Sequence, residues 1–248
     1  MNENKPLLFT LKMGFTLAVI TALVLVVSSA FTGYLESKNS STSLPVFDKT
    51  HRIRFVIDPG HGGEDAGAIA ADGTLEKDLN LSVALLLSTA LELNGCEVAL
   101  TRENDKLLYD YYGDLDDYTG QKKVYDLKNR LKIAEEKENS IYVGIHMNKF
   151  PEAKYSGLQV YYSQKNDLSY QLATDIKSAV FENLQPNNRR QIKAASNSIY
   201  VLHNATVPAV LIECGFLSNQ EELELLKNED YQKKLCLTLF SALCKYSS

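Results

Sequence analysis

Two hydrophobic periodicities alternate along residues 51–248. Short apolar runs, such as the one that ends at Ile57, are typical of strands, whereas apolar residues recurring every three or four positions from Leu79 to Leu93 are typical of a helix. The predicted strands cover 54–57, 97–101, 141–145, 157–162, 198–202 and 209–212. The predicted helices cover 79–93, 124–137, 167–184, 220–226 and 231–246, and the acidic, tyrosine-rich segment 103–123 is predicted to be irregular.

This alternation of strands and helices predicts an α/β fold. We expect a single domain with a mostly parallel or mixed sheet of about six strands, flanked by helices. Crossovers between parallel strands are right-handed, and the functional crevice of such a sheet lies at the carboxyl ends of its strands. Side chains that directly follow predicted strands are therefore the first candidates for a functional site.

The N-terminal region differs from the rest of the chain. Residues 13–35 carry no charge, and as a helix they would span about 35 Å, enough to cross the ~30 Å hydrocarbon layer of a membrane. We predict a transmembrane signal anchor there, a cytoplasmic N-terminus at 1–12, a polar linker at 36–50 and the catalytic domain at 51–248. The alternative is a signal peptide cleaved at the small residues 27–30, which also leads to an extracytoplasmic domain.

Composition excludes some classes of function. The net charge of −5 gives no general attraction to nucleic acid, and no basic stripe interleaved with aromatic residues is present, so nucleic-acid binding is not expected. No C-x-x-C pair occurs, so a thiolate zinc knuckle is not expected either. The mainly apolar neighbours of the cysteines predict buried thiols that pack as small hydrophobic side chains. These residues are Cys96, Cys214, Cys236 and Cys244.

Four side chains at strand ends or at a helix start have the chemistry of one shared site. His61 lies in the glycine-flanked run 59–63, which lets the backbone turn sharply and a ligand approach closely. Glu76 opens a predicted helix, while His146 and Glu213 directly follow apolar strands. Two imidazoles and a carboxylate, with a second carboxylate to transfer protons, are the inventory of a zinc hydrolase.

Each of these residues alone has a structural explanation. Glu76 fits the acidic preference of a first helical turn, His146 could be a core histidine, and Glu213 could belong to a buried salt bridge. A phosphate-binding loop is a competing interpretation of the glycine-rich run, but no G-x-x-x-x-G-K-[ST] or G-x-G-x-x-G pattern follows it. The expected meeting of all four residues at one sheet edge favours the metal site.

Longer strings carry a family resemblance over residues 54–242. This segment resembles the zinc-dependent N-acetylmuramoyl-L-alanine amidases of the AmiC-like (Amidase_3) family. The resemblance rests on IDPGHGGEDAGA (57–68), LEKDLNL (75–81), IHMN (145–148) and VPAVLIECGFLSN (207–219). Within the family, the string VGIHMNKFPEAKYSGLQVYY (143–162) and the single N-terminal anchor are similar to the spore-cortex, germination-specific amidases of endospore-forming bacteria.

The resemblance implies a role for each matched residue. His61, Glu76 and His146 would bind one Zn²⁺ per chain, and Glu213 would take a proton from water and return it to the departing amine. The implied reaction is hydrolysis of the amide bond between the lactoyl group of N-acetylmuramic acid and L-alanine of the peptidoglycan stem peptide. For the spore-cortex subfamily, this reaction belongs to the formation of muramic lactam.

Three further residues are candidates for contacts with the substrate or for orienting a ligand. Asn148 lies two residues after His146, and ligating histidines usually need such neighbours. Arg190 could meet a stem-peptide carboxylate, since arginine suits such groups, although a solvated loop is the alternative. His203 follows a strand-like run near the expected crevice.

Partners and location follow from the same interpretation. The expected partners are peptidoglycan, the membrane through the N-terminal helix, and an activator protein, with a peptidoglycan deacetylase as a pathway neighbour. We expect the catalytic domain outside the cytoplasm, in the forespore intermembrane space or cortex.

A zinc carboxypeptidase is a rival interpretation of the function, but it would present its first two ligands as H-x-x-E, whereas Glu76 comes much later than His61. A non-catalytic wall-binding domain is the other alternative.

Overall fold

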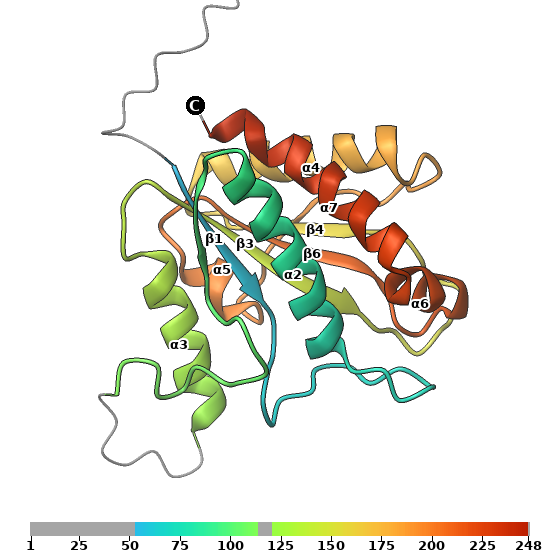
Figure 1. Ribbon diagram of the computed structural model, residues 1–248, viewed down its shortest axis with the longest axis horizontal. Coiled ribbons are helices and arrows are strands. Elements are labelled where there is room, and N and C mark those ends of the chain that lie inside the picture. Colours follow the sequence, from blue (N-terminus) through green and yellow to red (C-terminus); the bar gives the residue numbers. More distant parts are fainter. Residues whose placement is uncertain (1–52, 114–120, 248) are drawn as a thin grey trace, which may run out of the picture. The chain divides into compact units, whose positions relative to one another are not determined.

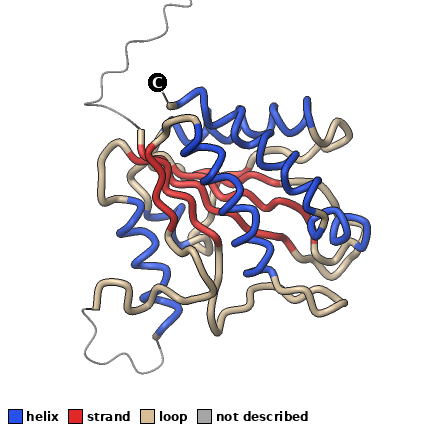
Figure 2. Tube along the Cα trace, in the orientation of Figure 1, coloured by secondary structure: helices blue, strands red, loops and turns tan. Residues whose placement is uncertain are grey.

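One six-stranded sheet lies at the centre of the residues that the computed structural model describes, which are 53–113 and 121–247 (Figures 1 and 2). The strands are β1 (Arg54–Pro59), β2 (Glu97–Leu100), β3 (Ser140–Asn148), β4 (Gln159–Tyr162), β5 (Lys193–Ala194) and β6 (Ala209–Phe216). Their order across the sheet is β2-β1-β3-β6-β4-β5. The pairs β2-β1, β1-β3, β3-β6 and β4-β5 are parallel, and β6-β4 is antiparallel. The predicted mixed, mostly parallel sheet is therefore confirmed.

Helices cover both faces of this sheet (Figure 1). One face packs against α2, α4 and α7, and the other packs against α3 and α5. The helices are α2 (Glu76–Leu93), α3 (Lys122–Ala134), α4 (Asp167–Asn183), α5 (Tyr200–Asn204), α6 (Gln220–Lys227) and α7 (Glu229–Leu243), followed by a 3₁₀ turn (Cys244–Tyr246).

The direction of side chains along the strands explains why there are two cores. On β1, Phe55 and Ile57 pack into the core under α2, whereas Val56 between them packs into the core under α3. On β6, Ile212 and Leu211 are divided between the two cores in the same way. Because successive strand residues point to opposite faces, a sheet covered on both faces requires continuous apolar runs, which is the pattern seen in the sequence.

The predicted strand at 198–202 is wrong. Its apolar residues belong to helix α5, in which Val201 and Leu202 are buried against the face covered by α3. A run this short is compatible with a strand or a helical turn, and tertiary packing decides between them. The short strand β5 was not predicted because its two residues are exposed and carry no periodicity.

Strands β3 and β6 extend beyond their predicted ends. As a result, His146 and Glu213 lie within these strands and pair with each other in the register of the sheet. The prediction that they directly follow their strands is corrected in this detail. Their position near the carboxyl ends of two neighbouring parallel strands is the expected one.

Several predictions concern residues outside the described part of the chain. These are the cytoplasmic N-terminus at 1–12, the membrane anchor at 13–35 and the linker at 36–50. In the residues that the structure describes, no helix combines the length and apolarity needed to cross a membrane. The segment 103–113 contains only turns, bends and irregular backbone, as predicted, while 114–120 lies outside the described residues.

The cysteines pack with the hydrophobic core. Cys214 and Cys236 are buried, and Cys96 and Cys244 are half-buried against the same core. Burial raises the pKa of Cys236 to about 12, so this residue is a protonated thiol near neutral pH. The prediction of packing thiols is confirmed for the two buried residues.

Candidate metal centre and active site

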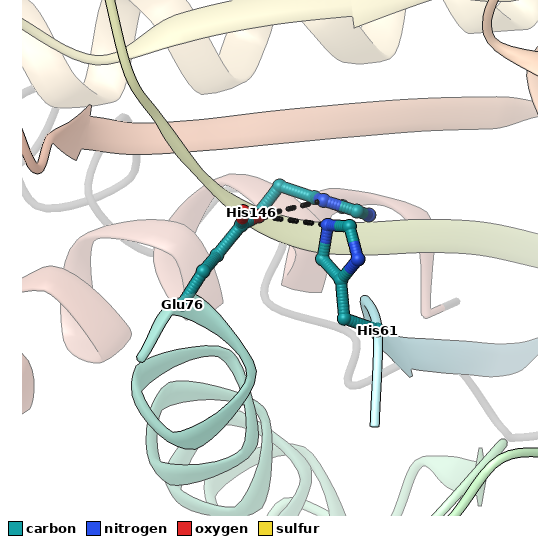
Figure 3. Close-up of side chains that lie close together, drawn as sticks. All are labelled: His61, Glu76 and His146. Atoms are coloured by element: carbon teal, nitrogen blue, oxygen red, sulfur yellow. Dashed lines mark hydrogen bonds and ion pairs between the residues drawn. The ribbon is translucent and has the colours of Figure 1, made fainter. Parts of the chain in front are cut away.

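Three segments bring metal-capable atoms together at one edge of the sheet (Figure 3). His61 lies in the loop after β1, Glu76 opens α2, and His146 lies on β3. One ligand atom from each residue lies within 4.8 Å of the other two. Glu76 Oε1 is 3.3 Å from His61 Nε2 and 3.0 Å from His146 Nδ1. The structure therefore places the three predicted ligands around a common point.

Two glycines make room for this arrangement. A Cβ atom at Gly60 would lie 2.1 Å from Cε1 of His146, and one at Gly67 would lie 2.6 Å from Oε2 of Glu76. Neither contact is sterically possible, so larger residues would displace the ligands. His61 itself adopts a left-handed φ of 63°, which is uncommon for a residue other than glycine and is held by the surrounding contacts.

Glu76 is fixed and ionised in this site. Its side chain is almost fully buried, and its oxygens accept hydrogen bonds from the backbone N–H groups of Ala68 (2.7 Å) and Met147 (3.2 Å). Burial alone would raise the pKa of this carboxyl, but the hydrogen bonds and charges of His146 and His61 lower it far below its ordinary value. An ionised carboxylate is the form that binds a divalent cation.

Asp65 orients the first histidine. Its Oδ2 lies 2.9 Å from His61 Nδ1, so His61 turns Nε2 toward Glu76. Burial would lower the pKa of His61, but Glu76 and Asp65 together raise it above its ordinary value. A carboxylate on the distal nitrogen of a ligating histidine fixes its tautomer and ring orientation. The sequence analysis missed Asp65, although a carboxylate four residues after a glycine-flanked histidine was the available signal.

A buried polar network holds the loop that carries His61. Asp58 accepts hydrogen bonds from Thr101, Tyr142 and Arg130. The guanidinium of Arg130 also pairs with Asp126 and donates to the carbonyl of His61 at 2.7 Å. Burial alone would raise the pKa of Asp58, but Arg130, Thr101 and Tyr142 lower it below its ordinary value.

The second arginine of the network holds the same loop. Arg102 Nε donates to the carbonyl of Pro59, and its Nη2 donates to the carbonyl of Gly60, both at 2.9 Å. The guanidinium groups of Arg102 and Arg130 therefore satisfy buried carbonyls of this loop, and Asn80 Nδ2 also donates to the carbonyl of Gly60. Sequence analysis did not identify this network.

Glu213 lies opposite His146 on the neighbouring strand. Its Oε2 is buried and has no hydrogen-bond partner in the described part of the chain. Desolvation by burial raises the pKa of Glu213 to about 7. A carboxyl with a pKa near neutrality can both accept and donate a proton at physiological pH. Glu213, His61 and His146 line a cavity of about 280 Å³, which also reaches Tyr200 of α5.

The residues fit a zinc ion. Two imidazoles and one carboxylate are a ligand set of catalytic zinc sites, which leave further coordination positions open to water and substrate. The ionised state of Glu76, the space left by the two glycines and the Asp65–His61 contact all agree with that set. The unpartnered Glu213 Oε2 lies at the same sheet edge.

Comparison with known proteins identifies the family. Residues 55–245 match the family described as N-acetylmuramoyl-L-alanine amidase. The chain belongs to this family. It is 35% identical over 204 residues to the germination-specific N-acetylmuramoyl-L-alanine amidase of Bacillus subtilis, a match that covers 82% of each protein.

Solved structures agree with this assignment. The CwlD amidase from Clostridioides difficile, in complex with the GerS lipoprotein, has 38% identity and a TM-score of 0.72, covering 78% of this chain and 98% of that one. The catalytic domain of CwlV, an N-acetylmuramoyl-L-alanine amidase from Bacillus (Paenibacillus) polymyxa, has 29% identity and a TM-score of 0.64, covering 78% and 97%. The family assignment favours the amidase over the rival carboxypeptidase.

The three weaker site candidates of this amidase do not line the cavity that contains His61, His146 and Glu213. Asn148 ends β3 beside Phe216, and its carbonyl accepts a hydrogen bond from Leu217 at 2.8 Å. His203 is exposed on α5. Arg190 lines a separate, larger cavity. Their roles in binding substrate or orienting ligands stay predictions.

Replacing Asp65 with asparagine is expected to weaken zinc binding by about 10–100-fold, because the amide leaves the tautomer and orientation of His61 less well fixed. Competition with a chromophoric chelator measures the affinity. Glu64→Gln is the matched control, because Glu64 is the exposed neighbour whose carboxylate pairs with Lys122 instead. Equal zinc affinities of the two variants would show that Asp65 has no orienting role.

Proposed function

We propose that this amidase hydrolyses the amide bond between the lactoyl carbonyl of N-acetylmuramic acid and L-alanine in peptidoglycan, using one Zn²⁺ held by His61, Glu76 and His146. The observation that carries the proposal is the meeting of these three ligand atoms at one sheet edge with Glu213 on the neighbouring strand. The family assignment supports the substrate class.

Glu213 is the proton-transfer group of the proposed reaction. When bound, zinc supplies Lewis-acid polarisation of the carbonyl and lowers the pKa of water. Glu213 takes a proton from the water molecule that attacks the carbonyl carbon, and delivers it to the leaving nitrogen as the C–N bond breaks. The products are the muramic acid carboxylate and a stem peptide with a free amino terminus. The pKa of about 7 suits a carboxyl that acts first as base and then as acid.

Product analysis tests this function. Purified enzyme with zinc is expected to release intact stem peptides from peptidoglycan, detected by mass spectrometry, and a chelator should stop the release. Release of single amino acids would instead identify a carboxypeptidase. Absence of any product with zinc bound would favour the non-catalytic alternative.

The zinc ligands can be tested separately. His146→Ala is expected to lower the zinc content of the purified protein well below one ion per chain, because it removes one of three protein ligands. Elemental analysis after dialysis measures the content. His203→Ala makes the same change at an exposed position of α5 and should leave the zinc content unchanged. Normal zinc content in His146→Ala would refute the ligand assignment.

We further infer a role in the spore cortex. The support is the similarity to a germination-specific amidase and to the CwlD amidase. In this role the enzyme exposes muramic acid for a peptidoglycan deacetylase, and muramic lactam results. Mass spectrometry of muropeptides from spores of a deletion strain is the test. Absence of muramic lactam supports the cortex role, and its normal presence refutes it.

Location and an activator protein belong to the same proposal. The uncharged segment 13–35 supports a membrane anchor with the catalytic domain outside the cytoplasm. The CwlD amidase was solved in complex with the GerS lipoprotein, which supports an activator protein as a partner of this chain. The test is to co-express a lipoprotein from the same operon or regulon as this amidase, and to measure zinc content and turnover with and without it.

A further inference from the structure

A second cavity lies at the same edge of the sheet as the proposed active site, on the face that α4 and α7 cover. It has a volume of about 580 Å³ and is formed by the segment before β4, the segment after α4, and parts of α6 and α7. Its lining includes Lys154, Tyr155, Asn188, Arg189, Arg190 and Glu222. Gln159 at the start of β4 pairs with Glu213 in the sheet, so the segment before β4 reaches this cavity from the same sheet edge as the metal centre.

Arg190 is held rigidly at the wall of this cavity. Its Nε donates to the carbonyl of Ser156 at 2.6 Å, and its backbone N–H donates to Asn188 Oδ1 at 2.9 Å. The guanidinium lies over the ring of Phe216, 4.4 Å from the centroid, and 5.9 Å from the ring centroid of Tyr155. A guanidinium held in this way loses little conformational entropy when it binds a ligand.

The outer edge of this guanidinium is available. In residues 53–113 and 121–247, no hydrogen bond or ion pair is found for the Nη1 or Nη2 atoms of Arg190. The nearby carboxylate of Glu222 is already engaged by the backbone N–H groups of Gly157 and Phe216, each at 2.8 Å. Two parallel N–H groups on one edge match the two oxygens of a carboxylate.

The charge of the cavity points to the same ligand. Lys154, Arg189 and Arg190 line the cavity together with the carboxylate of Glu222, and Lys154 also pairs with Glu152 outside the lining at 2.7 Å. Burial raises the pKa of Glu222, whereas the hydrogen bonds from Gly157 and Phe216 and the charge of Arg190 act in the opposite direction. This cationic wall contrasts with the net charge of −5 of the whole chain. A wall of this kind attracts an anionic group.

The position of Arg190 sets which part of a substrate can reach it. Phe216, on which it stacks, follows Glu213 by three residues on β6, which corresponds to roughly 10 Å along a strand. An extended peptide advances by at most about 3.5 Å per residue. An extended peptide covers that length with two or three residues, so a path across the end of the sheet from Glu213 toward Phe216 would bring its second or third residue toward Arg190.

We propose that this cavity is a subsite for the stem peptide, and that Arg190 binds the carboxylate of its second or third residue. The inference rests on the proposed function, because it takes the peptidoglycan stem as the ligand. It adds a recognition element that selects substrates by the charge of the peptide. Amidation of that carboxylate removes an anionic oxygen and so removes the match to the guanidinium.

Binding of a reaction product tests the subsite without turnover. The probe is the tripeptide L-Ala-γ-D-Glu-diaminopimelate, titrated into the full-length zinc-loaded protein by calorimetry. Arg190→Ala is expected to weaken binding by about tenfold or more, because a hydrogen-bonded charge pair is lost. Lys193→Ala removes the same charge from an exposed residue of β5 outside the cavity lining and should leave binding unchanged.

A second probe identifies the group that Arg190 binds. The tripeptides amidated at the glutamate α-carboxylate or at the diaminopimelate should bind wild type unequally, and the weakened one marks the contacted residue. In Arg190→Ala that amidation should have no effect. Arg190→Lys, which keeps the charge but not the planar fork, should show an intermediate affinity and guards against misfolding of the alanine variant.

The outcomes separate this inference from the proposed function. If Arg190→Ala binds the tripeptide as wild type does, or if amidation weakens both proteins equally, the subsite is wrong even when peptidoglycan is cleaved. If wild type binds the tripeptide through Arg190 but releases no stem peptide from peptidoglycan, the proposed function fails and the subsite stands.

Discussion

Glu213→Gln is expected to lower turnover on peptidoglycan by about 10²–10⁴-fold, because the amide cannot carry the proton from water to the leaving nitrogen. The substitution keeps the shape of the side chain. It leaves the three proposed zinc ligands unchanged, because they belong to other segments. Zinc content should therefore remain at one ion per chain, whereas turnover is lost.

Two measurements on the same preparation test this prediction. Elemental analysis gives the zinc content, and quantification of released stem peptides gives the rate. Glu135→Gln is a matched control, since the Glu135 carboxylate accepts hydrogen bonds from Thr206 and lines neither the metal-centre cavity nor the cavity beside Arg190. Near wild-type turnover of Glu213→Gln with metal bound would falsify the assignment of Glu213 as the proton carrier.

Arg130→Ala is expected to destabilise the domain by about 3–5 kcal/mol, because it leaves two buried carboxylates without their cation. Arg130 is 2% exposed, and its guanidinium pairs with both Asp58 and Asp126. It also donates to the carbonyls of Pro59 and His61, so the loop that carries His61 loses two hydrogen bonds as well. For a domain of this size the melting temperature should fall by roughly 10 °C.

Thermal unfolding of the metal-free protein measures this effect without a contribution from zinc. Lys128→Ala is the control on the same helix, because Lys128 is exposed and its loss should change stability by less than about 0.5 kcal/mol.

The dependence of stability on acid pH gives a second test. The pKa of Asp58 is lowered in the folded state, so its contribution is present above pH 3.8 and is lost as the pH falls below that value. In Arg130→Ala this acid dependence should shrink. If Arg130→Ala and Lys128→Ala melted at the same temperature, the network would contribute nothing to the stability of the domain.

Local sequence was sufficient to predict most of the architecture. Strands β1, β3 and β6 are continuous apolar runs, and α2 and α4 carry apolar residues at helical spacing, so their type follows from short-range patterns. The exceptions were short elements. Helix α5 and strand β5 have too few residues to show a period, and packing against distant segments determines them.

The candidate site divides in the same way. Sequence alone selected His61, Glu76, His146 and Glu213, because each lies at a strand or helix end and within a recognisable family string. The meeting of His61, Glu76 and His146, with Glu213 opposite His146, then required the parallel register of β1, β3 and β6. Asp65 was within one of the family strings, yet its contact with His61 became visible only when the loop conformation was known.

Only the tertiary structure determined the contacts between residues that are far apart in the chain. Asp58 and Arg130 are 72 residues apart in the chain and form a buried ion pair. Arg190, in the segment after α4, stacks on the ring of Phe216 on β6. Local periodicity reports which face of an element is buried. It does not report which distant polar side chains that burial brings together, because those contacts depend on how strands and helices are placed relative to one another.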